Sequence, residues 1–100
     1  MSYQVAEQDG ASVVYLAGDV DLEKSPQARA VLLECVDRKK DLVVDLEGVT
    51  YIDSSGIASL VEAFQAARKI DITFALRNVS VAAKKEIELA RLEKVFTILS

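Results

Sequence analysis

Histidine and tryptophan are absent from this chain of 100 residues, and cysteine and proline each occur once. Without histidine there is no Ser-His-Asp triad, no Cys-His nucleophile pair and no imidazole metal site, which excludes most hydrolase and metalloenzyme chemistries. The single thiol, Cys35, cannot form an internal disulfide and supplies no cluster of soft metal ligands. We therefore expect no cofactor and no metal, in a protein of a reducing compartment.

Long apolar runs and an excess of basic residues are missing too. No window reaches about 18 uninterrupted apolar residues, and the first residues contain no basic and then apolar leader, so neither a membrane span nor a secretion signal is expected. The net charge of −4 provides no basic footprint for nucleic acid. These absences predict a cytoplasmic protein that neither inserts into a membrane nor binds nucleic acid.

The first half of the chain predicts a hairpin and then a helix. Residues 3–8 and 11–16 read as two strands, and Asp9-Gly10 between them suits a type I′ turn. Residues 18–21 follow as a loop. Ser25 is expected to cap a helix with Pro26 at its first position, and Cys35 falls on the apolar stripe of that helix, which favours core packing for the thiol.

The rest of the chain alternates strands with helices. We expect a strand at 42–46 that is buried on both faces of the sheet, and then a helix with an apolar stripe over 57–67. A strand at 72–76, a helix capped by Ser80 and a last strand at 94–99 follow. The order is ββαβαβαβ. It predicts an α/β fold in which residues 1–100 form a single domain: a single-layer mixed, mostly parallel sheet with an N-terminal β-hairpin and helices packed on it.

One polar segment is not explained by core packing. Asp53-Ser54-Ser55-Gly56 stands between a predicted strand and a predicted helix, at the carboxyl edge of the sheet where ligands and partners usually meet such folds. In one interpretation Asp53 or a serine caps the helix and Gly56 permits a close backbone approach. In the other, one serine caps while its neighbour faces solvent and accepts a phosphate beside Asp53. Three polar positions of the following helix could extend the surface, namely Ser59, Glu62 and Gln65.

Enzymatic use of these serines is not supported. With no histidine a serine nucleophile would need a lysine base, and no Ser-x-x-Lys spacing places a lysine beside Ser54 or Ser55. We therefore expect a protein that is not an enzyme.

Residues 49–57, preceded by the apolar run 42–46, resemble the signature of the STAS domain, a family named for sulfate transporters and anti-sigma factor antagonists. Residues 16–21 resemble the early Gly-acid-apolar-Asp turn of that family, and residues 89–96 resemble its closing segment. Each piece is short, but together, in this order and spacing, they extend the similarity over nearly the whole chain.

The resemblance implies a bacterial partner-switching protein. In that family an unphosphorylated antagonist binds an anti-sigma factor with a serine-kinase fold, the kinase phosphorylates a serine of the Asp-Ser-Ser-Gly turn, and a serine phosphatase restores it. Ser54 matches the phosphoacceptor, and Ser55 the helix-start position, where capping is expected. The remaining positions that match the family's motifs, and so are implied for partner binding, are Asp19, Asp21, Asp53 and Gly56.

A second role within the same family stays open. Antagonists usually continue past the last strand into another helix, whereas this sequence ends at Leu99-Ser100. Short STAS proteins also serve as small cytoplasmic subunits of phospholipid-transport ABC systems, where they bind the ATPase. Those subunits often have threonine at the first motif position, so Ser54 favours the phosphorylated antagonist.

Overall fold

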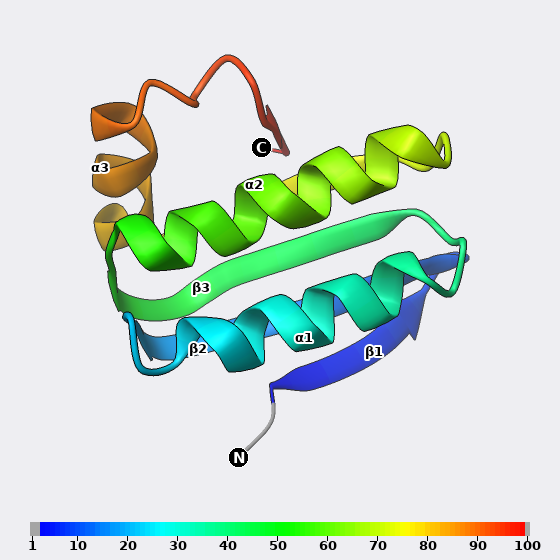
Figure 1. Ribbon diagram of the computed structural model, residues 1–100, viewed down its shortest axis with the longest axis horizontal. Helices are drawn as coiled ribbons and strands as arrows, with labels where there is room; N and C mark the ends of the chain where they lie inside the picture. The colour runs from blue at the N-terminus through cyan, green and yellow to red at the C-terminus, as the bar shows by residue number, and fades with distance from the viewer. Residues whose placement is uncertain (1–2, 100) are drawn as a thin grey trace.

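The computed structural model describes residues 3–99, so the outermost residues of the predicted single domain lie outside the described part. Within it the elements follow the predicted order (Figure 1). They are β1 (Gln4–Gln8), β2 (Ala11–Val20), α1 (Ser25–Val36), β3 (Leu42–Ile52), α2 (Ser54–Lys69), β4 (Phe74–Arg77), α3 (Val81–Leu89) and β5 (Thr97–Ile98).

The strands form one sheet in the order β1-β2-β3-β4-β5. β1 is antiparallel to β2, and every other neighbouring pair is parallel. In the hairpin turn Asp9 and Gly10 have φ of 52° and 82°. A type I′ turn requires positive φ at both positions, which an Asp-Gly pair adopts readily. The mixed, mostly parallel sheet with an N-terminal hairpin is therefore confirmed.

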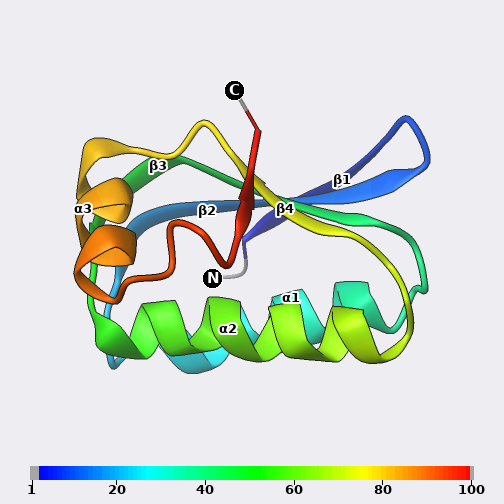
Figure 2. The same ribbon diagram turned by 90° about the horizontal axis from the view of Figure 1, so that it is seen from above.

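The two long helices lie side by side on one face of the sheet (Figure 2). Between sheet and helices the core is fully buried, with Leu16, Val44 and Leu76 from the strands and Leu32 and Leu60 from α1 and α2. Cys35 is also buried in this layer, as predicted, and burial raises the pKa of its thiol. The shorter α3 packs at the carboxyl end of β3 through Ala83 and Ile87, after a cap in which the Ser80 hydroxyl accepts from the Ala83 amide.

The second face of the sheet carries no helix among residues 3–99, yet Val13 on that face is only 1% exposed. A set of polar side chains from four strands lies across it, here called the open-face network: Gln8, Tyr15, Asp45, Arg77 and Asn78. Its centre is the Arg77 guanidinium, which lies 5.7 Å from the centroid of the Tyr15 ring. The network takes the place of a second helix layer over this face.

Every member of the open-face network is hydrogen-bonded. Arg77 donates from Nε to Asp45 Oδ2 at 2.9 Å, from Nη2 to Tyr15 Oη at 3.1 Å and from Nη1 to Gln8 Oε1 at 3.2 Å. Asp45 also accepts from the Asn78 side chain and from the Glu47 amide. Burial alone would raise the pKa of Asp45, but the hydrogen bonds from Glu47, Arg77 and Asn78 outweigh it, and the pKa is lowered.

The predicted bounds of four strands were wrong, and one of them, β4, begins at Phe74 instead of residue 72 and ends at Arg77 instead of residue 76. β2 continues through the predicted loop to Val20, and β3 continues beyond residue 46 to Ile52, because the two strands stay paired to their ends. Register shifts along this pair give β3 two extra residues relative to β2, which changes the spacing of its buried positions. The last strand is shorter than predicted, because only residues 97 and 98 pair with β4.

The predicted cap of α1 was also wrong. Ser25 is the first helical residue and is buried, and the cap position is Lys24, which makes no side-chain cap bond. The turn before the helix is held instead by Asp21, whose Oδ1 accepts from the Glu23 and Lys24 amides at 3.1 and 3.0 Å. Lys24 already has helical dihedral angles, so Ser25 lies too late in the turn to cap.

Candidate functional site

The carboxyl edge of the sheet brings together the β2–α1 loop, the β3–α2 turn and the start of α3, at the left-hand end of Figure 1. Val20 at the end of β2 pairs with Ile52 at the end of β3, so the residues that follow each strand are neighbours in space. The motif Asp53-Ser54-Ser55-Gly56 forms the junction between β3 and α2. We use the name carboxyl edge for this surface, formed by residues 17–24, residues 47–56 and the first turn of α3.

Asp53, and not Ser55, caps α2. Its Oδ1 accepts from the Ser55 amide at 2.9 Å and the Gly56 amide at 3.2 Å, and Ser55 also donates its hydroxyl to the same oxygen. The hydrogen bond from the Ser55 hydroxyl is the main cause of a lowered pKa for Asp53, with further contributions from the amides of Gly56, Ser55 and Leu22. The carboxylate therefore holds the start of α2, while the Asp53 amide donates to the Val20 carbonyl oxygen at 3.4 Å and ties the turn to the end of β2.

The two serines differ in what their hydroxyls do. Ser54 is the first residue of α2 and is exposed, and its hydroxyl has no hydrogen-bond partner within residues 3–99. Ser55 is half-buried, and its hydroxyl is committed to Asp53. Of the pair, Ser54 has the accessible hydroxyl.

Gly56 is required by close packing. It is buried, and a Cβ at this position would lie 2.6 Å from the Val20 carbonyl oxygen and 2.6 Å from Ile52 Cγ1. The expectation of a close backbone approach is confirmed, because the first turn of α2 passes directly over the ends of β2 and β3.

Asp19 and Asp21 lie at the same edge as the motif. Asp19 is exposed at the end of β2, pairs in register with Tyr51, and accepts a hydrogen bond of 3.2 Å from the Thr50 hydroxyl. Asp21 is occupied with the turn before α1, as described above. The structure thus brings the three predicted aspartates to one edge, and each of them also holds a neighbouring backbone or side-chain group in place.

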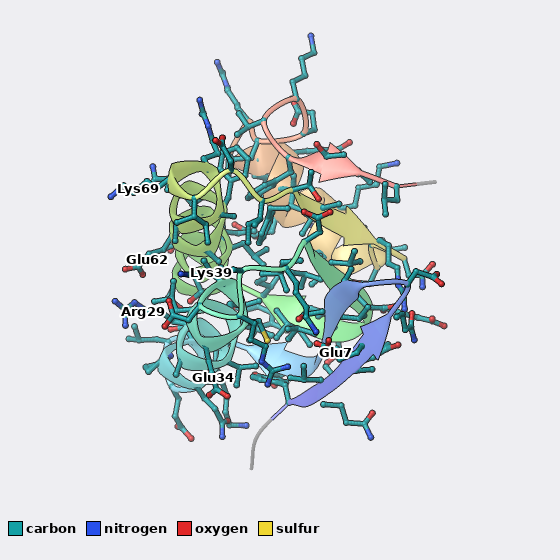
Figure 3. All side chains as sticks on the ribbon, turned by 90° about the vertical axis from the view of Figure 1, so that its right-hand side faces the viewer. Glu7, Arg29, Glu34, Lys39, Glu62 and Lys69 are labelled. Atoms are coloured by element: carbon teal, nitrogen blue, oxygen red, sulfur yellow. The ribbon has the colours of Figure 1, made fainter. Side chains whose placement is uncertain are left out.

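Ser59 was wrongly predicted to extend the surface. Its side chain is buried and donates to the carbonyl oxygens of Ser25 and Ser55, both at 3.2 Å, which ties the start of α1 to the start of α2. A shallow groove of about 260 Å³ runs between these helix starts. Arg29 of α1 and Glu62 of α2 line this groove and form an exposed ion pair across the two helices (Figure 3).

Exposed apolar side chains at this edge were missed by sequence reasoning. Leu22 in the β2–α1 loop is 76% exposed, Tyr51 at the end of β3 is 51% exposed, and Val81 at the start of α3 is 87% exposed. Leu22 and Val81 could have been noticed as apolar residues outside the helical stripes. Tyr51 could not, because its orientation depends on the register shifts of β3.

Residues 3–99 contain neither a cluster of metal ligands nor a helix suited to a membrane. No group of three or more histidine, cysteine, aspartate or glutamate side chains is arranged to hold a metal ion. No helix in this part of the chain is long and apolar enough to cross a membrane.

Comparison with known proteins settles the family. The model of the STAS domain matches residues 2–100. The chain belongs to the STAS domain family. An anti-sigma-B factor antagonist of Bacillus subtilis is 24% identical to this STAS domain over 98 residues, which are 98% of this chain and 90% of the relative.

Solved structures agree with this assignment. An anti-sigma factor antagonist from Mycobacterium paratuberculosis is 26% identical, with a TM-score of 0.89 over 97% of this chain and 83% of that one. The Bacillus cell fate determinant SpoIIAA in its phosphorylated form shares the fold, with a TM-score of 0.74 and 18% identity over 99% and 92% of the two chains. This STAS domain is thus similar to proteins described as anti-sigma factor antagonists.

Proposed function

We propose that this STAS domain is an anti-sigma factor antagonist that binds an anti-sigma factor with a serine-kinase fold through the carboxyl edge. Phosphorylation of Ser54 by that kinase switches binding off, and a serine phosphatase restores it. The observation that carries the proposal is the difference between the two serines. The Ser54 hydroxyl is exposed and has no hydrogen-bond partner in the described part of the chain, whereas the Ser55 hydroxyl is held by Asp53.

The chemistry requires only an accessible hydroxyl from this chain. Ser54 Oγ forms a bond to the γ-phosphorus of ATP as the bond from that phosphorus to the bridging oxygen breaks, the hydroxyl proton passes to a base of the kinase, and ADP leaves. In the reverse direction water attacks the phosphorus and inorganic phosphate is released. Neither step needs a catalytic side chain here.

The expected effect of phosphorylation is electrostatic. A phosphoserine adds about −1.5 to −2 charges at neutral pH. The Ser55 and Gly56 amides at the start of α2, which would otherwise stabilise an anion, already bond to Asp53, so the phosphate would stand beside a carboxylate that occupies them. A partner that covers the edge excludes water and strengthens this repulsion, while the core stays unchanged.

Mass spectrometry tests the modification. The protein is incubated with ATP and each serine-kinase-fold anti-sigma factor encoded in the genome of its source. We expect one phosphate on Ser54, none on a Ser54→Ala variant, and an unchanged yield on Ser55→Ala, which is the matched control. No phosphate on Ser54 with any of these kinases would contradict the proposal.

Binding measurements test the switch. We expect Ser54→Asp to bind the anti-sigma factor at least tenfold more weakly than wild type, about 1.4 kcal/mol, and Ser54→Ala to bind with nearly wild-type affinity. Equal affinity of wild type and Ser54→Asp would argue against control by charge. Co-purification with an ABC ATPase, with binding indifferent to Ser54→Ala, would assign the protein to the transport role instead.

A further inference from the structure

We propose that three apolar side chains, Leu22, Tyr51 and Val81, anchor the partner at the carboxyl edge, and that the partner's surface has an apolar centre bordered by lysine or arginine. The inference rests on the proposed function, because it takes the edge around Ser54 as the partner-binding surface. It goes further in naming the residues that supply affinity and the chemistry of the surface they fit.

The three anchors come from three separate elements that surround the motif. Leu22 lies near it, since the Asp53 amide donates to the Val20 carbonyl oxygen at 3.4 Å and Leu22 follows Val20 by two residues. Tyr51 lies two residues before Asp53 on β3, and Val81 follows the cap of α3, the helix that packs on β3. Single exposed apolar residues are normal on a protein surface, but large ones gathered from three elements around one turn indicate an interaction site.

The charge around the anchors indicates what kind of partner fits. Residues 17–24 and 47–56 contain five acidic residues and one basic residue, a net charge of −4 that equals that of the whole chain. Glu23 and Glu47 are exposed, and neither carboxylate forms an ion pair within the described residues. The acidic residues of 17–24 and 47–56 form a border, here called the acidic border. It lies on the β2 and β3 side of the anchors only, because Lys84 and Lys85 follow Val81 on α3. A basic border on the partner would complement it and speed encounter.

Ser54 belongs to the same edge as the anchors, so a negative charge on it opposes binding even to a partner with a basic border. The border charges stay near water, whereas a phosphate on Ser54 would be covered by the apolar centre of the complex. There it would lose hydration and face the Asp53 carboxylate at a lower effective dielectric constant. Loss of hydration in the centre then outweighs attraction at the border.

The experiment first identifies the partner by purifying the tagged full-length protein from its own cells, and then measures affinity with the purified partner. We expect Leu22→Ala, Tyr51→Ala and Val81→Ala each to weaken binding about tenfold or more, as truncations of interface anchors do. The matched control is Ile70→Ala, an exposed apolar residue just after α2, at the opposite end of the molecule, which should leave the affinity unchanged. Circular dichroism checks that each variant keeps the fold.

The acidic border is tested through the association rate. We expect the wild-type rate to fall steeply with salt, and the dependence to weaken in a Glu23→Gln/Glu47→Gln double variant. Glu34→Gln is the control, because Glu34 is a similarly exposed acid in the last turn of α1, away from the edge (Figure 3). An association rate that does not change with salt would overturn the basic border. So would an equal salt dependence of that rate in the double variant and the control.

The outcomes separate this inference from the proposed function. If the partner is a serine-kinase-fold anti-sigma factor and the three anchor variants bind like wild type, the proposed function stands and the anchors are overturned. If the partner is an ABC ATPase whose binding falls with the anchor variants, the anchors stand and the proposed function is overturned. If the wild-type protein recovers no partner, both are overturned.

Discussion

Asp53 uses a single carboxylate oxygen to accept hydrogen bonds from two amides of α2 and from the Ser55 hydroxyl. The carboxylate keeps Ser55 occupied and leaves Ser54 free. At the scale of one residue, which serine is available for the phosphorylation that we propose therefore depends on the neighbouring Asp53.

Truncation of Asp53 should reveal its role as a cap. We expect Asp53→Ala to lower the free energy of unfolding by about 1 kcal/mol, because two amides at the start of α2 lose their acceptor. Asp53→Asn should cost much less, since asparagine caps helices nearly as well. Urea unfolding of the three proteins measures the difference, and equal losses for both variants would mean that charge rather than capping matters.

The motif could be found from the sequence because Asp, Ser and Gly at a junction between strand and helix have few other uses. What the sequence did not determine was the assignment within it. Capping was expected of Ser55, but Asp53 comes directly before the first helical residue, has extended dihedral angles and so takes the cap position. Ser25 was wrongly predicted to cap α1. It is itself the first helical residue, and the preceding Lys24 already has helical dihedral angles.

The first turn of α2 packs closely against the ends of β2 and β3. Gly56 lets the first turn of the helix pass over the ends of β2 and β3, and this sets the position of Ser54 relative to both strands. The Val20 carbonyl oxygen is a backbone atom and cannot move aside as the end of a flexible side chain could.

A Gly56→Ala variant tests this packing. Inside a helix alanine is normally favoured over glycine by up to about 1 kcal/mol. Here we expect the opposite sign, a loss of about 1–3 kcal/mol, because the added Cβ overlaps Val20 and Ile52. Thermal unfolding gives the answer, and a variant that is more stable than wild type would show that α2 can shift away without cost.

The length of β3 shows where sequence patterns fail at the scale of an element. The buried positions of its second half are Leu46, Val49 and Ile52, spaced by three residues instead of two. The spacing results from the two extra residues that β3 carries relative to β2. Because spacing by three is foreign to a regular strand, the segment after residue 46 resembled a loop.

At the scale of the whole molecule, the open-face network replaces a layer of helices. Arg77 is bonded to three of its partners, and Asp45 beneath it has a side chain that is only 6% exposed. Removal of the guanidinium would leave a buried carboxylate with fewer donors, which costs more than loss of an exposed ion pair.

We expect Arg77→Ala to destabilise the protein by about 2 kcal/mol at neutral pH. The exposed pair of Arg29 and Glu62 provides the matched control, and Arg29→Ala should cost less than about 1 kcal/mol. Urea unfolding of both variants beside wild type measures the two losses. Similar losses would show that the network contributes no more than a surface pair.

The stability that is lost on Arg77→Ala should also depend on pH. The pKa of Asp45 is lowered in the folded state, so its contribution is fully present above the unfolded value of about 3.9 and disappears as pH falls through the folded value. The stability difference between wild type and Arg77→Ala should therefore narrow below about pH 4. A difference that stays constant with pH would assign the effect to packing of Arg77 on Tyr15.

The same network bears on the order of folding. Gln8 and Arg77 are 69 positions apart along the chain, and Tyr15 and Arg77 are 62 apart. Contacts at such separations close long loops, and they form only after the intervening strands have paired. We therefore expect the guanidinium to join the hairpin to β4 late in folding, so that Arg77→Ala accelerates unfolding more than it slows folding.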